Sequence, residues 1–311
     1  MNAGIGSPAN RPAQTPAGSI YDLGYRHYEG KRRGRLYAAW SLYVDSLRGI
    51  WGFGRPMSAK AAPFILAGLY ALPSFFQLAF SSVLANEIKQ GQAPTLFTYS
   101  NYFGGVGILL VLFLVAQAPE VVCRDQRYQV LPLYFTRAMG RADYALARLA
   151  SLATALFLAL LVPMIALFVG DILMKTDTLS AIGDEWPTAL PVIPAYLLFA
   201  LGLSALALAL SSYSPRRAYS AIGLLAYYLL MEAIPTIIWS LGQQSGWTWS
   251  DKLVLVTPVT VLEGATDWFF GKPLSSALPT TLGSDVYVIA SVASVLLFTA
   301  VLLFRYRRIS A

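Results

Sequence analysis

Six long stretches of this 311-residue sequence contain almost no charge, and they constrain its fold more than any other feature. A helix needs about 20 apolar residues to cross a hydrocarbon core roughly 30 Å thick. The stretches of this kind are residues 63–84, 102–119, 149–170, 188–212, 218–241 and 286–304, and only the fifth contains a charged residue, Glu232. The sequence therefore predicts an all-α polytopic membrane protein whose six transmembrane helices lie within residues 63–304.

Composition excludes the common soluble classes. Hydrophobic residues make up 56% of the chain and charged residues only 13%, whereas about a quarter of the residues in soluble proteins are charged. A single cysteine, Cys123, excludes an intrachain disulfide, and a single histidine, His27, argues against a His-rich metal centre. We therefore expect no catalytic residues and no metal site.

The distribution of lysine and arginine predicts the orientation of the six spans. Nineteen of the 23 basic residues precede the first span, follow the sixth, or lie in the second-to-third and fourth-to-fifth connections. Because positive charge favours the cytoplasmic side, both termini are expected in the cytoplasm (N-in and C-in). The expected location is the plasma (inner) membrane. The net charge of +7 thus reflects topology, and no nucleic-acid partner is expected.

The segments outside the spans have different patterns. Residues 1–35 are predicted to be a disordered, polar cytoplasmic region, because the first 18 have almost no apolar bulk. No cleaved signal peptide is expected, since the first long apolar run begins only at Pro63. Residues 305–311 form a basic cytoplasmic tail. The apolar run 253–262 is too short to cross and contains Pro258, which favours an interfacial or re-entrant segment between the fifth and sixth spans.

Residues 36–56 are predicted to form an amphipathic helix. Its apolar residues recur at spacings of three and four, with Ser41, Asp45 and Arg48 between them; they are Tyr37, Trp40, Tyr43, Val44, Leu47, Ile50 and Trp51. An aromatic face flanked by arginine suits the cytoplasmic headgroup layer. A soluble helix packed on a partner is the alternative.

The sequence encodes no nucleotide site that we can identify. Residues 24–31 are superficially similar to a phosphate-binding loop, but five residues separate Gly24 from Gly30, and Arg32 stands where Ser or Thr would bind magnesium. His27 has no nucleophile nearby in the sequence. ATP and Mg²⁺ are therefore expected on a separate partner protein and not on this chain.

The second-to-third connection is the most informative segment. Charges at Arg124, Asp125 and Arg127 precede an apolar group formed by Val130, Leu131 and Tyr134. This pattern predicts a short amphipathic element that offers charge and shape to a surface. We expect Pro132 to interrupt the element and Asp143 to cap the next helix.

This connection resembles that of the permease subunits of ABC-2-type ABC transporters. The positions that match are Glu120, Arg124, Asp125, Arg127, Leu131, Pro132, Arg137, Arg141 and Tyr144. The sequence departs from the family pattern at Gln129-Val130, where a Gly-Thr pair is common, and at Ala138, where proline often stands. The similarity extends more loosely to six spans, a preceding interfacial helix and membrane-dipping segments at residues 253–270.

The resemblance implies a function and partners. In that family the connection carries a coupling helix that sits in a groove of a separate cytoplasmic ABC ATPase, and a second permease copy or a homologous permease completes the path. Here Arg124, Asp125 and Arg127 would be polar contacts, with Val130, Leu131 and Tyr134 as the apolar anchor. The alternative is that these arginines only enforce topology and bind membrane lipid.

Glu232 leaves a second function open. A carboxylate inside a span is costly and must face protein, water or a partner. It is either a transport-pathway residue or a hydrogen-bonded contact between helices. The former would suit an ion-coupled secondary transporter, although no internal repeat supports that alternative. An intramembrane enzyme lacks the necessary cluster of His, Asp or Ser and is the least favoured class.

Overall fold

The structure is a computed structural model that describes residues 33–87, 98–100, 102–136, 139–174, 178–275 and 278–308. The chain divides into two units, Met1–Arg33 and Gly34–Ala311. The disorder predicted for residues 1–35 falls almost entirely outside the described residues, and so does the end of the basic tail. The helices described below all belong to the second unit.

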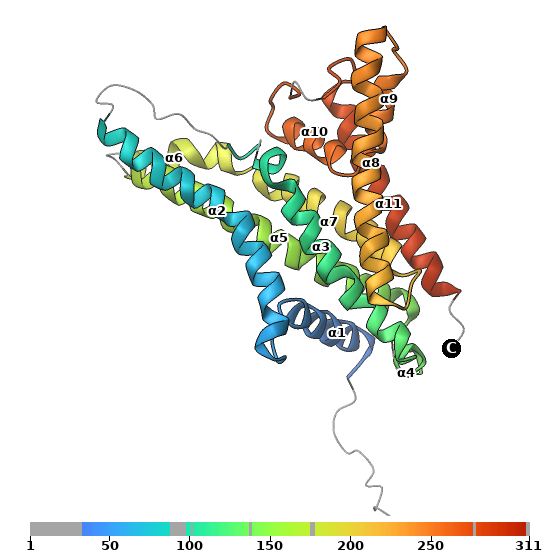
Figure 1. Ribbon diagram of the computed structural model, residues 1–311. Helices are drawn as coiled ribbons and strands as arrows, with labels where there is room; N and C mark the ends of the chain where they lie inside the picture. The colour runs from blue at the N-terminus through green and yellow to red at the C-terminus, as the bar shows by residue number, and fades with distance from the viewer. Residues whose placement is uncertain are drawn as a thin grey trace, which may run out of the picture. The chain divides into compact units, whose positions relative to one another are not determined.

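This unit is built from helices and, within the described residues, contains no strand. In chain order the helices are α1 (Arg35–Ile50), α2 (Met57–Glu87), α3 (Tyr102–Arg127), α4 (Leu131–Phe135), α5 (Arg141–Met174), α6 (Thr178–Ala189), α7 (Val192–Ser211), α8 (Arg217–Ser245), α9 (Ser250–Leu253), the 3₁₀ turn η1 (Val254–Val256), α10 (Thr260–Phe269) and α11 (Ser284–Arg307) (Figure 1).

The prediction of six membrane-crossing helices is confirmed by length and composition. The regions that are long and apolar enough are Met57–Val83, Val106–Arg127, Arg141–Leu173, Leu179–Ser211, Arg217–Ser245 and Ser284–Arg307. Each contains most or all of one predicted span. The protein is therefore a multi-pass membrane protein of the all-α class.

Two helices extend beyond the membrane spans predicted from the sequence. The second span was predicted to end at residue 119 and the third to begin at residue 149, but α3 continues to Arg127 and α5 begins at Arg141. Apolar composition marks where lipid ends, whereas a helix continues as long as its backbone and its packing allow. At about 1.5 Å per residue, the 34 residues of α5 span about 51 Å, which exceeds the hydrocarbon thickness.

The fourth predicted span, residues 188–212, contains a break. Helix α6 ends at Ala189 and α7 begins at Val192, with a turn at residues 190–191 between them. Leu190 precedes a proline, Pro191, and the proline ring disfavours helical geometry in the residue before it. Within the region Leu179–Ser211, α7 is thus the uncharged part, and α6, which contains Asp184 and Glu185, is a separate helix before it.

Helix α7 lies at the centre of the packing. From Phe199 onward its side chains are buried or half-buried on every side, whereas Ile193 and Leu197 nearer its start are exposed. A helix that is hydrophobic on all sides must be covered on all sides, and here α3, α5, α8, α10 and α11 pack around it. The hydroxyl of Tyr228 on α8, a fully buried tyrosine, donates to the Leu203 carbonyl on α7 at 3.2 Å.

Helix α1 matches the predicted amphipathic segment but is shorter, because a turn follows Ile50. It packs against α5 through Leu42, Ser46 and Ile50, while Trp40 is 61% exposed. In Figure 1, α1 and α4 lie at the same end of the unit as the last residues of α11. The aromatic side chain of Trp40 is thus free to face a surrounding medium.

The predicted irregular segment between the fifth and sixth spans is present as α9, η1 and α10, at the opposite end of α8 and α11 (Figure 1). Pro258 lies in the turn that separates η1 from α10. Two glycines let α10 approach its neighbours closely: a Cβ on Gly264 would lie 2.6 Å from Tyr287 of α11, and one on Gly202 of α7 would lie 3.1 Å from Leu262.

Candidate functional site

The segment that the sequence singles out lies at the end of the unit where α1, α3, α4 and α5 meet. Arg124, Asp125 and Arg127 occupy the last turn of α3 rather than a separate loop. Three residues then connect α3 to α4. One of them, Gln129, has a left-handed backbone with φ of 52°, a conformation that glycine adopts without strain. This is the position at which the sequence departs from the glycine common in the ABC-2 pattern.

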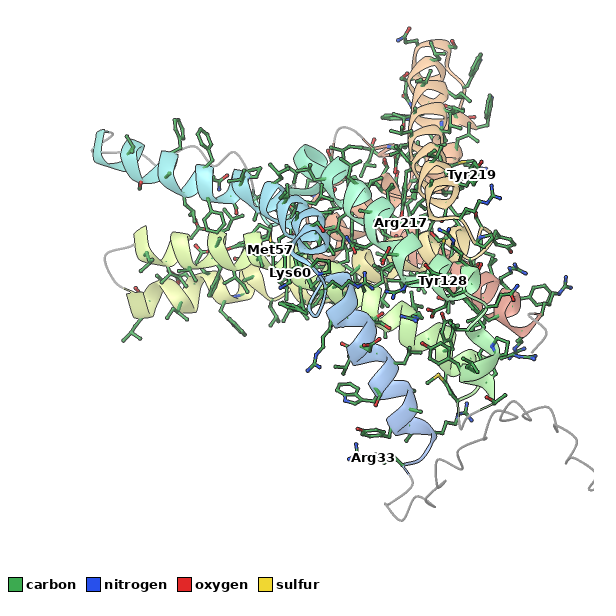
Figure 2. The ribbon with its side chains drawn as sticks, turned by 60° about the horizontal axis from the view of Figure 1, so that its bottom comes forward. Arg33, Met57, Lys60, Tyr128, Arg217 and Tyr219 are labelled. Atoms are coloured by element: carbon green, nitrogen blue, oxygen red, sulfur yellow. The ribbon has the colours of Figure 1, made fainter. Side chains whose placement is uncertain are left out.

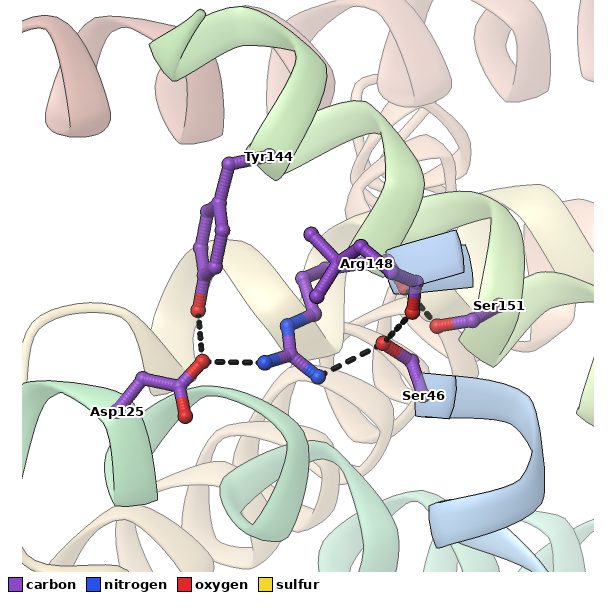
Figure 3. Close-up of polar contacts among 6 residues, drawn as sticks. Ser46, Asp125, Tyr144, Arg148 and Ser151 are labelled. Atoms are coloured by element: carbon purple, nitrogen blue, oxygen red, sulfur yellow. Dashed lines mark hydrogen bonds and ion pairs between the residues drawn. The ribbon is translucent and has the colours of Figure 1, made fainter. Parts of the chain in front are cut away.

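A buried ion pair ties three helices together at this point (Figure 3). Asp125 of α3 accepts a hydrogen bond from the Tyr144 hydroxyl of α5 at 2.6 Å and forms a salt bridge with Arg148 of α5. A second guanidinium nitrogen of Arg148 donates to the Ser46 hydroxyl of α1 at 2.7 Å. The four side chains, which we call the brace, are all buried. Because buried charges must be paired, the brace fixes the relative positions of α1, α3 and α5.

A second ionic contact joins the same end of α3 to α2 and α8. One carboxylate oxygen of Glu120 lies 2.6 Å from Arg55, which precedes α2, and the other lies 2.9 Å from Arg217 at the start of α8. Glu120 was predicted as a coupling residue, and the structure shows it bridging two arginines. The end of α3 is thereby linked by charge to three other segments: the residues before α2, the start of α8, and α5.

The predicted apolar anchor lies mostly against the chain itself. Leu131 of α4 is 4% exposed, and the Tyr134 ring packs on Tyr144 with centroids 5.5 Å apart. Burial raises the pKa of Tyr134, and the charge of Asp125 raises it further, so its hydroxyl stays neutral. Pro132 was predicted to interrupt this element. It lies instead in the first turn of α4, where a missing N–H costs nothing.

The outward surface is made by different residues. Leu133 is 65% exposed and Tyr128 is 66% exposed. Arg124 and Arg127 are exposed as well, as predicted for polar contacts, whereas Asp125 is buried in the brace. Val130 is half-buried. The exposed set therefore combines two arginines with one aromatic and one aliphatic side chain.

The remaining predicted residues flank α4. Arg137 lies outside the described residues. Arg141 donates to the carbonyl of Arg307 at 3.1 Å, and its guanidinium lies 5.7 Å from the centre of the Phe135 ring. Asp143, predicted to cap α5, lies in the first turn of that helix and accepts a hydrogen bond from the Gly140 N–H at 2.9 Å. This is one of the two hydrogen bonds of a capping box.

A hollow of about 590 Å³ opens beside the brace, between α1 and the ends of α3 and α4. Its walls carry three acidic and three basic side chains, namely Asp45, Glu120, Asp125, Arg55, Arg124 and Arg148. Its balanced charge does not select for an anionic or a cationic ligand. Within the described ranges, no group of three or more His, Cys, Asp or Glu side chains is placed to hold a metal.

No protein-family model matches this sequence, and no curated protein matches it. The resemblance to ABC-2-type permeases therefore depends on the residues of the second-to-third connection, and family membership stays a prediction.

The structure gives Glu232 a set of partners. One carboxylate oxygen accepts the backbone N–H groups of Val259 and Thr260, the latter at 3.2 Å, and the other accepts the Thr260 hydroxyl at 2.7 Å. Glu232 of α8 thus caps the start of α10, where backbone N–H groups lack helical partners and attract negative charge. Of the two interpretations of Glu232, this geometry favours the contact between helices.

Sequence reasoning missed Ser46, Arg55, Arg148 and Arg217 as members of this site. One signal was available for Arg148: it follows Tyr144 by four residues, so the two share a helix face. The partners of Glu120 and the role of Ser46 depend on which helices meet, and no local pattern in the sequence records that.

Proposed function

We propose that this chain is the permease subunit of an ABC-2-type transporter, an exporter driven by a separate cytoplasmic ABC ATPase that binds ATP and Mg²⁺. The observation that carries the proposal is the brace directly behind an exposed, amphipathic surface. This chain itself is proposed to bind no cofactor. It would receive mechanical work through α4 and the end of α3.

The brace supports this proposal because it joins the surface rigidly to membrane-crossing helices. Asp125 belongs to α3 and Arg148 to α5, and each helix continues from the brace across the apolar region. A displacement of α4 is therefore transmitted to both helices and, through Ser46, to α1. Coupling of this kind needs a contiguous set of packed and hydrogen-bonded groups, which the brace supplies.

The exposed residues suggest how a partner binds. Leu133 and Tyr128 supply apolar area, and Arg124 supplies charge beside it. Interfaces are enriched in aromatic residues and arginine, whose burial contributes most of the binding energy. We assign direct ATPase contact to these three residues, and we assign to Asp125, Leu131 and Tyr134 the support of the surface from behind.

The positions of the basic segments support a cytoplasmic location for both termini. Arg35 contacts Asp143, Arg55 and Arg217 contact Glu120, and Arg141 contacts the carbonyl of Arg307. Segments that the charge rule assigns to one side thus meet at one end of the helices. With this end in the cytoplasm of a plasma (inner) membrane, α1 lies in the headgroup layer and α9 to α10 dip into the opposite leaflet.

A six-span permease would need a second copy, or a homologous permease, to enclose a path. Helices α8 and α11 present many exposed apolar side chains, among them Leu230, Ile237 and Leu296. Membrane lipid covers such faces in a single copy, and part of them would become the contact between two copies.

The test uses the chain together with a candidate ABC ATPase, to be sought first in the neighbouring reading frames. We expect the two to co-purify and the chain to stimulate ATP hydrolysis in reconstituted vesicles. Leu133→Asp combined with Arg124→Glu should abolish both, because it places negative charge on the contact surface. Arg307→Glu, which changes an exposed arginine at the same end, is the matched control and should retain both.

Two outcomes would contradict the proposal. One is a stable complex whose ATP hydrolysis is indifferent to the α4 variant. The other is uphill transport by the purified chain without an ATPase, which would favour the ion-coupled alternative. The engagement of both Glu232 oxygens by α10 disfavours that alternative, and Glu232→Gln is therefore expected to leave the stimulation of ATP hydrolysis in place.

A further inference from the structure

A second hollow lies on another side of the end of α3 and is strongly basic. It has a volume of about 1040 Å³ and is lined by Gln126 and Arg127 from α3 and by Arg216, Arg217 and Tyr219 from the start of α8. In Figure 2, Arg217 and Tyr219 project from α8 on the side where Tyr128 marks the end of α3. We call this hollow the α3–α8 groove.

The charges that line the α3–α8 groove are not balanced. Three arginines line it, and among the residues that the structure describes the one carboxylate that forms a salt bridge with any of them is that of Glu120, 2.9 Å from Arg217. Glu120 also pairs with Arg55 at 2.6 Å, so it neutralises Arg217 only in part. Arg127 and Arg216 are exposed and form no salt bridge within the described residues, and the Arg216 guanidinium lies 5.6 Å from the centre of the Tyr219 ring. The groove therefore favours an anion.

The surroundings of the groove favour an anion that is attached to an apolar chain. Helix α8 runs from the groove into its apolar part, and the side chains that follow are exposed, Ile222 at 67% and Leu229 at 50%. Arginine forks match phosphate geometry, and the exposed face of α8 offers apolar surface directly beyond them. A phospholipid satisfies both requirements at once, whereas a free phosphate uses only the first.

We propose that the α3–α8 groove binds the headgroup phosphate of an anionic phospholipid, with the acyl chains along the exposed apolar face of α8. The lipid would thereby hold the end of α3, and with it the coupling surface, against the start of α8. This inference rests on insertion of the chain in a membrane, and it does not require the proposed ATPase.

The test is native mass spectrometry of the purified full-length chain in detergent, titrated with phosphatidylglycerol and, in parallel, with phosphatidylcholine. The wild-type chain should retain phosphatidylglycerol preferentially. Each arginine near an anionic lipid contributes about fivefold in affinity. Arg127→Gln with Arg216→Gln should therefore weaken retention about 25-fold, and the addition of Arg217→Gln should weaken it by roughly 100-fold.

A charge-matched control separates the groove from general attraction. Neutralising Lys60, Arg307 and Arg308 removes the same charge elsewhere and should leave retention unchanged. The double variant leaves every salt bridge of Arg217 and Glu120 intact, so it keeps the test valid if the triple variant misfolds. Equal retention of both lipids, an unaffected double variant or an equally weakened control would overturn the proposal. Displacement of the lipid by millimolar inorganic phosphate would also overturn it, by assigning the groove to a free anion.

Because the measurement uses the chain alone, its failure leaves the proposed ATPase coupling untouched, and loss of ATPase stimulation leaves the lipid site untouched.

Discussion

The two ends of the helices satisfy their buried and half-buried carboxylates in different ways. At the α3–α4 end, Asp125 and Glu120 face arginines. At the α9–α10 end, Asp251 accepts hydrogen bonds from the neutral groups of Trp239, Gln243 and Thr281 at 3.0, 2.8 and 2.6 Å, and Glu232 accepts from the start of α10. All the salt bridges within the described residues lie at the first end.

This difference indicates different tasks. Neutral donors fix a carboxylate in one geometry, because each hydrogen bond is directional. Each bond also anchors the helix or loop to which its donor belongs. At the α3–α4 end, the buried ion pair of the brace joins charged groups of different helices, so these helices are held together as one unit. The α9–α10 end is suited to a fixed closure, and the α3–α4 end is suited to passing a displacement from one helix to the next.

The largest predicted effect concerns the brace. Arg148→Met leaves Asp125 buried without its charge partner, and breaking a buried ion pair costs about 3–5 kcal/mol. Asp125→Leu with Arg148→Met removes both charges and should cost less than Arg148→Met alone. The free energy of unfolding, measured by SDS titration in mixed micelles, checks both. Arg307→Met at the same end is the control, and a double variant no more stable than the single one would show that the charges do not act as a pair.

The next prediction probes the neutral end. Asp251→Ala leaves three donors without their acceptor, for a loss on the order of 2–3 kcal/mol by the same measurement. Asp251→Asn keeps an acceptor oxygen and should recover part of this. If both substitutions were silent, the hydrogen bonds of Asp251 would contribute nothing to the closure.

The third prediction uses pH. Burial raises the pKa of Glu263 in α10 to about 7 from its ordinary value of 4.5, and the charges of Glu232 and Asp267 add to the shift. A carboxyl with a raised pKa in the folded state binds protons more tightly there, so its contribution is favourable at low pH and declines as pH rises from 4.5 to about 7. At pH 8, Glu263→Gln should therefore be more stable than the wild type.

The expected difference in unfolding free energy is on the order of 1–2 kcal/mol at pH 8 and close to zero at pH 4.5. Comparing variant with wild type at each pH cancels the titration of other groups. Glu185→Gln is a control whose carboxylate belongs to a different helix, α6. A pH-independent difference would contradict the assignment of the shift to Glu263.

The sequence predicted the spans because the requirement for 20 apolar residues is local. The irregular segment near Pro258 and the amphipathic helix α1 were also predicted, because their signals are local as well. These signals are a short apolar run that contains a proline, and apolar residues at spacings of three and four. The apolar runs did not show that α3 and α5 continue beyond the predicted spans, to Arg127 and from Arg141. Local patterns thus determine what enters lipid and leave open where each helix stops.

The site was predicted only in outline. The charged cluster at residues 124–127 was identified, but which member faces outward depends on the position of Arg148, 23 residues away from Asp125 in the chain. The same applies to Glu232, whose partner Thr260 lies 28 residues further on. Pairings of this kind follow from helix crossing, so they require the structure.

The smallest predicted effect tests whether every ion pair at the α3–α4 end acts like the brace. Arg35 lies 2.7 Å from Asp143, but its side chain is 64% exposed, so water and salt screen the pair. Arg35→Gln should leave the unfolding free energy unchanged within error. Asp143→Ala should cost roughly 1 kcal/mol, because it also removes the acceptor for the Gly140 N–H at the start of α5. Equal losses for the two variants would mean that the pair, and not the cap, stabilises this end. In that case an exposed ion pair of α1, Arg35 with Asp143, would stabilise the protein as the buried brace contact of Ser46 on the same helix does. Exposure would then not distinguish the two contacts.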